Sequence, residues 1–491
     1  MKNDKGVILL LILIFFAALP FFYFKQGLLL VDTGREFYIP QQMLSGGVLF
    51  KDIFNIYGAL SYQINALLFL IFGQKLSVLY YAGIFNSLLI IITLYFLARE
   101  FLNKSISFLF SLFIMSALVF SVFLYNSNLT YCFAVVYALS AFLLSLLFLI
   151  KYTKNKNAVY AYLSAFFAGI SFAHKYEFIF YFMLLPYFLR SLGLKNLFKA
   201  FLCFAAAPLI SYGALLIQGL NFNDIKISAE LISSLVSAPI VKKFFYGLSL
   251  AAYHSGIFSI FAVIPVLNVI LLFLYRKEII KNQALFVLIL CAIAASAKSF
   301  FSLNVFHMGI FLLPVCFLAL ITMLNIKYKQ FLPFLLVFCV LLFAAEDFKT
   351  LKNKTFLLET EKGSIYTYKK DGLMIKTAAD YILKNTKPSE RAVVMPEGSI
   401  INFLTDRKGD NTYYNLSPLF YYDVFGEKRI LEHFNKNLPE YFIILPLDNI
   451  EYGYHFFGTD YAQKFYEMII NNYGLDIETN GIKIFKKKDI Q

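Results

Sequence analysis

The sequence contains no tryptophan and little charge for its length. Only 15% of its 491 residues are charged, whereas 60% are hydrophobic and the mean hydropathy is +0.68. A water-soluble fold cannot bury so much apolar surface, so the composition excludes a soluble globular protein. The lack of tryptophan beside 58 phenylalanines and 34 tyrosines is a bias of the whole chain, and we attach no function to it.

Several motifs that would point to other functions are also missing. The five cysteines lie inside apolar stretches and none forms a C-x-x-C pair, which argues against a disulfide framework or a zinc site. No P-loop or G-x-G-x-x-G motif accompanies the strands expected near the C-terminus, so we expect no nucleotide site there. No small-residue cleavage site follows the first apolar run, and we expect a retained first helix rather than a signal peptide.

Acidic residues are scarce in segment 1–346, which holds ten of the 30 in the chain. Segment 347–491 has 20 basic and 20 acidic residues, so the formal net charge of +14 belongs to the first segment. The pI of about 9.2 therefore does not indicate a nucleic-acid partner. This contrast predicts two domains, a transmembrane domain over 1–346 and a second domain over 347–491.

Long apolar stretches recur through the first segment. Each is close to the length that crosses about 30 Å of hydrocarbon at about 1.5 Å per helical residue. The sequence therefore predicts an α-helical polytopic membrane protein with about eleven transmembrane helices. We expect them near 7–24, 77–98, 105–124, 129–150, 158–172, 176–190, 196–218, 250–275, 283–298, 305–324 and 331–346.

Basic residues are concentrated in every second loop between these helices. If the N-terminus is cytoplasmic, the inside loops hold fifteen lysines and arginines, and the longer outside loops of the same segment hold nine. The positive-inside rule favours this orientation. An odd number of spans then places 347–491 outside the cytoplasm.

Two outside loops are long enough to carry structure. In loop 25–76, Pro40 and the Gly46-Gly47 pair divide the chain, which predicts a short interfacial helix followed by an interfacial or re-entrant piece at 59–72. Loop 219–249 mixes charged and apolar residues at near-helical spacing and predicts another pair of interfacial helices.

The C-terminal segment has the pattern of a small extracytoplasmic α/β domain. Short apolar runs alternate with amphipathic stretches. We expect helices at 378–384, 399–404, 428–434 and 461–471, and strands at 391–395, 441–445 and 482–485.

Three carboxylates gather just after the first apolar run, at Asp32, Glu36 and Asp52. A charged group costs roughly 2.5 to 3.5 kcal/mol at the centre of a spanning helix. Their concentration at one water-facing margin indicates that the chemistry of the protein lies there.

The triplet Asp32-Thr33-Gly34 is also the signature of aspartic proteases. That class needs the triplet on a loop between β-strands and a second copy or a homodimer, whereas here it occurs once, after an apolar helix. We therefore set the protease aside and keep two alternatives for Asp32. It is either a helix cap or interfacial turn, or a general base whose pKa is raised by partial burial. Glu36 and Asp52 have the same two alternatives.

Cationic side chains at the outside ends of the predicted helices form a complementary set, namely Lys51, His174, Lys175, Lys298 and His307. For Lys175, the alternatives are contact with a substrate, snorkelling, or a local ion pair with Glu177. His307 is either a satisfied helix-end histidine or a substrate contact.

A carboxylate and several cations at an outer membrane surface suit a reaction on a lipid phosphate. The cations would hold the departing phosphate while the carboxylate deprotonates an attacking hydroxyl. The hypothesis is glycosyl transfer from a polyprenyl-phosphate sugar. Two rivals stay open: a transporter or flippase of lipid-linked sugars, which favours ionisable residues in mid-helix and internal repeats, and a non-catalytic scaffold.

Four motifs carry a family resemblance. They are Asp32-Thr-Gly-Arg-Glu-Phe-Tyr38, Met43-Leu-Ser-Gly-Gly-Val-Leu-Phe-Lys-Asp52, Asn55-Ile-Tyr-Gly58, and Met395-Pro-Glu-Gly-Ser399 with Asn402 and Arg407. With them the chain resembles the GT-C superfamily of integral-membrane glycosyltransferases, and is similar to bacterial protein O-mannosyltransferases and lipid A aminoarabinose transferases. Two positions depart from the pattern: Ala59 stands where relatives often have proline, and Thr33 replaces the second acid of the mannosyltransferase pair.

The resemblance implies that Asp32 is the catalytic base and that the donor is a polyprenyl-phosphate-linked hexose or pentose at the cell membrane. The acceptor would be a lipid, a glycan or a protein of the cell envelope. We expect no dedicated metal-binding side chains, although a divalent metal stays open as a cofactor because Asp32, Glu36 and Asp52 could supply oxygen ligands. The expected substrate-binding residues are Arg35, Glu36, Lys51, Asp52, Tyr57, His174, Lys175, Glu177, Lys298 and His307.

Overall fold

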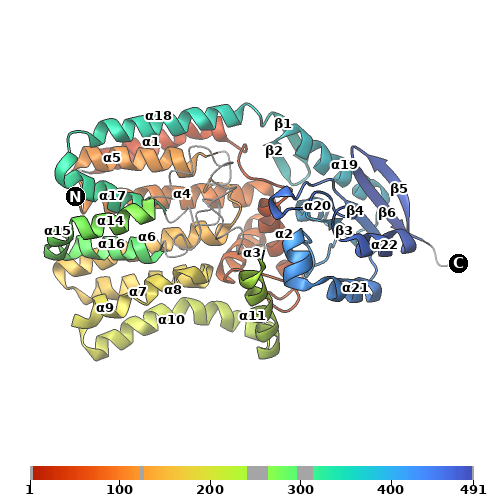
Figure 1. Ribbon diagram of the computed structural model, residues 1–491, viewed down its shortest axis with the longest axis horizontal. Helices are drawn as coiled ribbons and strands as arrows, with labels where there is room; N and C mark the ends of the chain where they lie inside the picture. Colours follow the sequence, from red (N-terminus) through yellow and green to blue (C-terminus); the bar gives the residue numbers. More distant parts are fainter. Residues whose placement is uncertain (1–3, 122–125, 240–263, 296–312, 489–491) are drawn as a thin grey trace.

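The computed structural model describes residues 4–121, 126–239, 264–295 and 313–488. Long helices fill one end of the molecule, and a mixed sheet with its own helices fills the other (Figure 1). The two chain termini lie at opposite ends of the long axis (Figure 1).

The helices of the first part follow the predicted apolar stretches. They are α1 (Lys5–Phe22), α4 (Leu76–Arg99), α5 (Lys104–Ile114), α6 (Phe133–Asn155), α7 (Ala158–His174), α8 (Ile179–Phe182), α9 (Leu185–Leu189), α10 (Leu194–Ile217), α14 (Ile264–Leu274), α15 (Arg276–Lys281), α16 (Gln283–Ala295), α17 (Leu313–Tyr328) and α18 (Leu332–Leu351). Among the described residues, α1, α4, α6 and α10 are long and apolar enough to cross a membrane. The count of eleven stays a prediction, and the stretch at 176–190 is broken into short helices.

Helix α6 forms the centre of this part, because 89% of its most apolar stretch of 18 residues is buried. The corresponding stretches of α1 and α10 are only 17% and 22% buried, so these two helices lie at the periphery. The helices approach closely where small residues face a neighbour. A Cβ atom added to Gly169 of α7 would lie 1.9 Å from the Phe204 carbonyl oxygen of α10. Close contact through small residues is typical of helix packing in membranes.

The basic turns lie together at the end of the molecule that holds the N-terminus (Figure 1). Arg99, at the end of α4, pairs with Asp4 at 3.2 Å, and Lys154, at the end of α6, pairs with Glu100. Lys156 reaches the first residue of α16 by a hydrogen bond of 3.2 Å. The loops that the positive-inside rule assigned to one side therefore share one end of the structure.

Helix α2 (Asp32–Leu44) corrects one expectation from the sequence. An interfacial helix was expected, but ten of its thirteen residues are buried, because it packs between α3 (Leu60–Phe72) and α20 (Ser399–Thr405) of the C-terminal part. Gly34 permits this approach, since an added Cβ would lie 2.9 Å from the Ile400 Cβ. Pro40 lies inside the helix and does not divide it.

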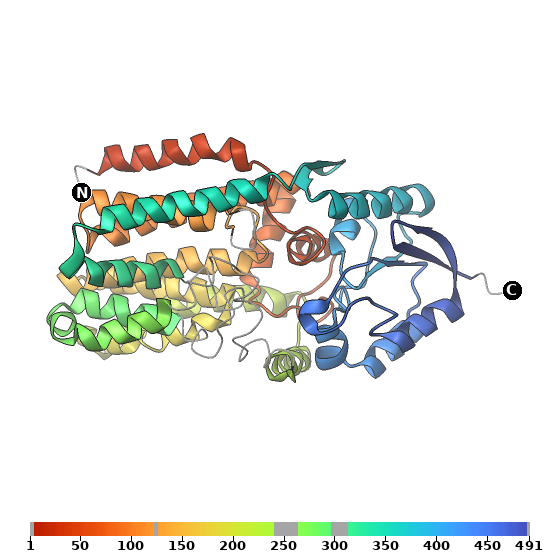
Figure 2. The same ribbon diagram turned by 45° about the horizontal axis from the view of Figure 1, so that its top comes forward.

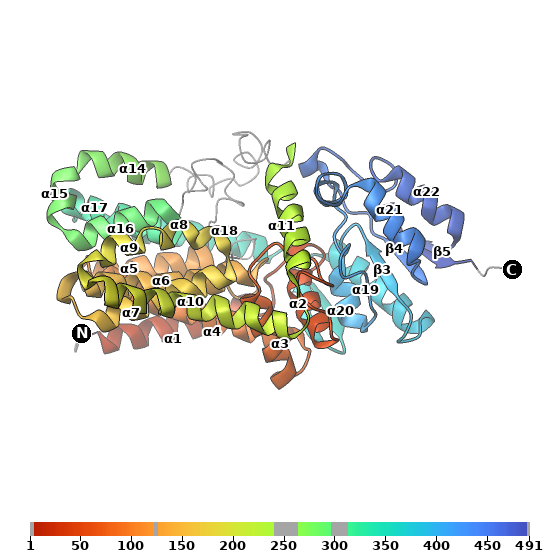
Figure 3. The same ribbon diagram turned by 90° about the horizontal axis from the view of Figure 1, so that it is seen from below.

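Two further short helices flank α2. Helix α3 (Leu60–Phe72) exposes Leu67, Leu70 and Ile71 on one side, so its interfacial position remains consistent with the sequence. Helix α11 (Phe222–Ser237) crosses between the helical part and the C-terminal part (Figure 3), where Leu231 joins an apolar cluster with Leu419 and Phe420. The partner helix expected within 219–249 lies largely outside the described residues.

The C-terminal part is built on a four-stranded sheet in the order β3-β4-β6-β5. Strand β3 (Ala392–Met395) is parallel to β4 (Tyr441–Ile444), whereas β6 (Ile482–Lys487) is antiparallel to both β4 and β5 (Tyr473–Thr479). The helices around it are α19 (Lys369–Asn385), α20, α21 (Glu427–Lys436) and α22 (Gln463–Asn472). The expected strands and helices are all present.

Three strands were not predicted from the sequence. Strand β5 carries Tyr473, Leu475 and Ile477 at alternate positions, but Leu475 and Ile477 are exposed, and its pairing with β6 defines it. The other two form a hairpin, β1 (Phe356–Thr360) and β2 (Gly363–Thr367), which follows the end of α18 (Figure 2). The hairpin also touches the membrane part, because the Leu76 amide at the start of α4 donates to the Lys362 carbonyl at 2.9 Å.

Candidate active site

Asp32 is the first residue of α2, and about a third of its side chain is exposed. The N-cap position belongs to Val31, and the Asp32 carboxylate pairs with the Arg35 guanidinium at 3.2 Å, one turn further along the helix. Burial by the surrounding protein raises the pKa of Asp32, while the charge and hydrogen bond of Arg35 oppose that rise. A carboxylate suits the role of a general base when it is exposed to water, when a neighbouring cation favours its ionised form and when burial makes it more basic than a free aspartate.

Glu36 lies beside this pair and is fully buried. Its Oε1 accepts a hydrogen bond from the Tyr62 hydroxyl at 2.8 Å, and its Oε2 accepts one from the Phe133 amide at 2.9 Å. The Arg35 Nε lies 3.7 Å from the same carboxylate. Through these two hydrogen bonds, Glu36 links α2 to α3 and to the start of α6.

Tyr57 joins Arg35 and Lys175, two of the predicted substrate-binding residues. The Arg35 guanidinium lies 5.6 Å and the Lys175 ammonium 4.9 Å from the centre of its ring, both within cation–π range. Lys175 is 9% exposed and pairs with Glu177 at 3.4 Å. The structure thus brings Arg35, Tyr57, Lys175 and Glu177 together beside Asp32.

A close backbone contact sets the position of Tyr57. The Gly58 amide donates to the His174 carbonyl at 3.0 Å, and a Cβ on Gly58 would lie 2.0 Å from the Ala173 oxygen. Only glycine allows this approach, so the motif Asn55-Ile-Tyr-Gly58 meets the end of α7.

His174 is 2% exposed, and its ring lies 5.4 Å from that of Tyr137. Its Nδ1 has no hydrogen-bond partner among the described residues. Lys298 and His307, the other two cations expected from the sequence at outer helix ends, lie outside the described residues.

Lys51 and Asp52 belong to a separate exposed turn. The Asp52 carboxylate accepts from the Val48 amide at 2.9 Å, and the Lys51 ammonium donates to the Gly219 carbonyl at 3.2 Å. In the described part of the chain, neither side chain contacts Asp32. The structure therefore does not bring these two predicted residues to the Asp32 pair, and their role as substrate contacts remains a prediction.

The C-terminal part adds two carboxyl groups that sequence reasoning did not assign to the site. Burial raises the pKa of Glu397 to about 8, and the charge of Asp32 adds to the rise while Arg35 opposes it. Burial and the charge of Asp32 likewise raise the pKa of Glu451. Both groups are therefore close enough to Asp32 for their charges to interact.

Glu397 follows a cis Met395–Pro396 bond, and its carboxylate accepts a hydrogen bond from the Asn415 side chain. The sequence did offer one signal for Glu397, because it lies in the motif Met395-Pro-Glu-Gly-Ser399 that carries the family resemblance. That resemblance assigned Glu397 no chemical role. No comparable signal marked Glu451. Across the described ranges, no three acidic, histidine or cysteine side chains are grouped to hold a metal ion.

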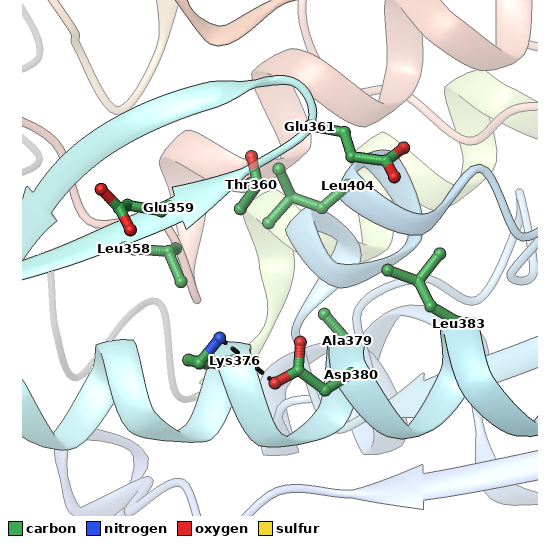
Figure 4. A pocket seen from close by; sticks show the side chains of 9 residues that line it. All are labelled: Leu358, Glu359, Thr360, Glu361, Lys376, Ala379, Asp380, Leu383 and Leu404. Carbon is green, nitrogen blue, oxygen red and sulfur yellow. Dashed lines mark ion pairs between the residues drawn. The ribbon is translucent and has the colours of Figure 1, made fainter.

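A small pocket lies elsewhere, between the β1–β2 hairpin, α19 and Leu404 of α20 (Figure 4). Its volume is about 40 Å³, and its rim carries the ion pair of Lys376 and Asp380 at 3.3 Å. None of the residues described above lines it. We assign it no chemistry.

Comparisons with known proteins support the fold through structure rather than sequence. No family model matches the chain, and no curated protein matches it. Among solved structures, ArnT from Cupriavidus metallidurans, bound to undecaprenyl phosphate, superimposes with a TM-score of 0.56 at 12% identity and covers 98% of each chain. The chain has a GT-C-like fold.

A second solved structure has a similar fold. The oligosaccharyltransferase of Archaeoglobus fulgidus, tethered to an acceptor peptide, superimposes with a TM-score of 0.51 at 12% identity, over 90% of this chain and 69% of the other. Its apo form gives a TM-score of 0.51 at 13% identity with the same coverage. The similarity to ArnT extends through both the membrane helices and the C-terminal part, because it covers nearly the whole chain.

Proposed function

We propose that this protein transfers a sugar from a polyprenyl-phosphate-linked donor to a hydroxyl or amine acceptor at the extracytoplasmic face of the membrane. Asp32 acts as the general base. The observation that carries the proposal is the pair of Asp32 and Arg35 beside the Tyr57–Lys175 contact, at the start of α2 in a GT-C-like fold.

The reaction is a displacement at the anomeric carbon of the sugar. Asp32 takes the proton from the acceptor O–H or N–H, and the acceptor atom forms the new bond to the anomeric carbon. The bond between that carbon and the phosphate oxygen breaks, and the polyprenyl phosphate leaves with the electron pair. Lys175 stabilises the charge that develops on the phosphate. Lys298 and His307, which lie outside the described residues, are predicted further contacts to it.

The orientation follows from the basic loops. With the N-terminus in the cytoplasm, the end of the molecule that holds Arg99, Lys154 and Lys156 faces inward. Asp32 and the C-terminal part then lie on the outer side, where we propose that the donor binds. The acceptor is a lipid, a glycan or a protein of the cell envelope.

The deciding experiment measures incorporation of labelled sugar from a panel of polyprenyl-phosphate sugars in detergent-solubilised membranes that contain the protein, because these membranes also supply the acceptor. A general base typically contributes about 10²–10⁴-fold, so Asp32→Asn should lower turnover by at least about 10²-fold. Glu230→Gln, on the exposed face of α11, is the matched control and should keep wild-type turnover.

The alternative is a flippase, which moves the lipid-linked sugar without breaking its bond to phosphate. A flippase gives no released polyprenyl phosphate in detergent but redistributes the donor between leaflets of proteoliposomes. Equal turnover by wild type and Asp32→Asn would reject Asp32 as the base.

A further inference from the structure

Lys354 is a buried cation that the proposed chemistry does not use. It follows the end of α18 and is 1% exposed. Its ammonium donates to the Gly27 carbonyl at 2.6 Å and lies 5.1 Å from the centre of the Tyr368 ring. Gly27 belongs to segment 24–31, which leads directly into Asp32.

The β1–β2 hairpin holds the same segment at a second point. The Tyr366 amide of β2 donates to the Phe24 carbonyl at 2.8 Å, and the Lys25 ammonium lies 5.4 Å from the Tyr366 ring centre. The C-terminal part thus contacts three of the four residues from Phe24 to Gly27.

The membrane part holds segment 24–31 from the other side. The Gln26 side chain donates to the Val119 carbonyl at 3.0 Å and the Ser121 carbonyl at 2.9 Å, and accepts from Asn128 at 3.0 Å. Gly27 has a φ of +87°, and a Cβ there would lie 3.1 Å from Leu129. The segment is therefore held by contacts on both sides.

The fixed segment is linked directly to the start of α2. The Leu28 amide donates to the Thr33 hydroxyl at 3.0 Å, and the Thr33 amide donates to the Leu28 carbonyl at 3.2 Å. These two bonds close a loop around Asp32. A shift of Gly27 would therefore move the Asp32 backbone and its carboxylate.

A buried ammonium is costly, which argues against a role in stability alone. Burial lowers the pKa of Lys354 to about 8, while the nearby charge of Asp371 opposes the shift. The lowered value means that burial disfavours the charged form, so the cation destabilises the fold most below pH 8, and the cost is relieved as the pH rises. An apolar side chain of similar length avoids this cost.

We propose that Lys354 is a positioning residue: by holding the Gly27 carbonyl it fixes segment 24–31 and so orients the Asp32 carboxylate. The C-terminal part thereby takes part in the reaction without its lysine touching the substrate. This inference rests on the proposed role of Asp32.

The test compares Lys354→Met with Lys352→Met, an exposed neighbour on the same turn. Hydrogen–deuterium exchange of the full-length protein should become faster over residues 24–33 in Lys354→Met and stay unchanged in Lys352→Met. In transfer assays with the polyprenyl-phosphate sugar that the wild type uses, kcat of Lys354→Met should fall by at least about tenfold, because misplacing a catalytic group costs turnover. KM for that donor should change by less than about threefold, because donor contacts remain.

The unfolding temperature in detergent separates positioning from stability. Lys354→Met removes a buried charge but leaves the buried Gly27 carbonyl without its hydrogen bond. The two effects oppose each other, so the unfolding temperature should stay close to that of the wild type. Unchanged exchange over 24–33, or an unchanged kcat, overturns the proposal while leaving glycosyl transfer intact. If no donor is transferred by the wild type, the proposed function fails, and the exchange measurement still decides whether Lys354 holds the segment.

Discussion

The Arg35 guanidinium lies 3.2 Å from the Asp32 carboxylate, and the Arg35 side chain is 8% exposed whereas that of Asp32 is 34% exposed. The pair is therefore asymmetric: the base faces water and its cation does not. The guanidinium favours the ionised form of Asp32, whereas burial favours the protonated form. The buried Glu36 carboxylate lies 3.7 Å from the Arg35 Nε. Arg35 therefore sets how easily Asp32 accepts a proton, and its contacts with Glu36 and Tyr57 keep it in place.

Replacing Arg35 by glutamine should shift the pH dependence of sugar transfer. Arg35 lowers the pKa of Asp32, so its loss raises that pKa further, and less of the base is ionised at a given pH. The acidic limb of the kcat/KM profile should move to higher pH, with the largest loss of activity at low pH and a partial recovery at high pH. Lys226→Gln, on exposed α11, serves as the control and should leave the profile unchanged. An equal loss at every pH would contradict this role of Arg35.

The carboxylate of Glu36 should contribute to stability through Tyr62. Hydrogen bonds to charged groups contribute about 1.5–3 kcal/mol, and a buried partner left without its bond is costly. Glu36→Ala and Tyr62→Phe should each lower the unfolding temperature in detergent, and the double variant should lose less than the sum, with a coupling of about 0.5–3 kcal/mol. Tyr328→Phe, at an exposed tyrosine, should leave the unfolding temperature unchanged. Strict additivity would show that the 2.8 Å contact contributes nothing.

The sequence predicted most of the architecture because hydrophobicity is a local property. Helices such as α6 and α10 could be located because an apolar run of that length is typical of a helix that spans a membrane. The burial of α2 could not be predicted, because its covering surface, α20, lies more than 350 residues away in the chain.

The candidate site could be predicted only in part. Asp32, Arg35 and Lys175 stand out as charges beside apolar runs, and the structure brings them together. Glu397 and Lys354 lie in a segment with many charged residues, so the sequence does not distinguish them from the other acids and lysines around them. Their significance comes from contacts with residues near the N-terminus, which no local pattern contains.

Gly58 should be intolerant of any side chain. An alanine Cβ would lie 2.0 Å from the Ala173 carbonyl oxygen, so Tyr57 and the end of α7 must separate. Gly58→Ala should therefore lower both the unfolding temperature and sugar transfer, since Lys175 loses its contact with the Tyr57 ring. Gly213→Ala, in α10, has open space around it and should be neutral or stabilising by up to about 1 kcal/mol. Equal effects at the two glycines would contradict the close approach.

Glu397 should control the alkaline limb of the reaction. With its pKa raised to about 8, Glu397 is neutral below that pH and negative above it. Its ionisation adds a second negative charge near Asp32, which repels a phosphate-bearing donor, so wild-type transfer should decline above about pH 8. Glu397→Gln stays neutral and should keep its activity at high pH, with rates similar to the wild type below pH 7. Glu467→Gln, at an exposed glutamate of α22, should decline as the wild type does. If Glu397→Gln also declines above pH 8, the alkaline limb belongs to another group.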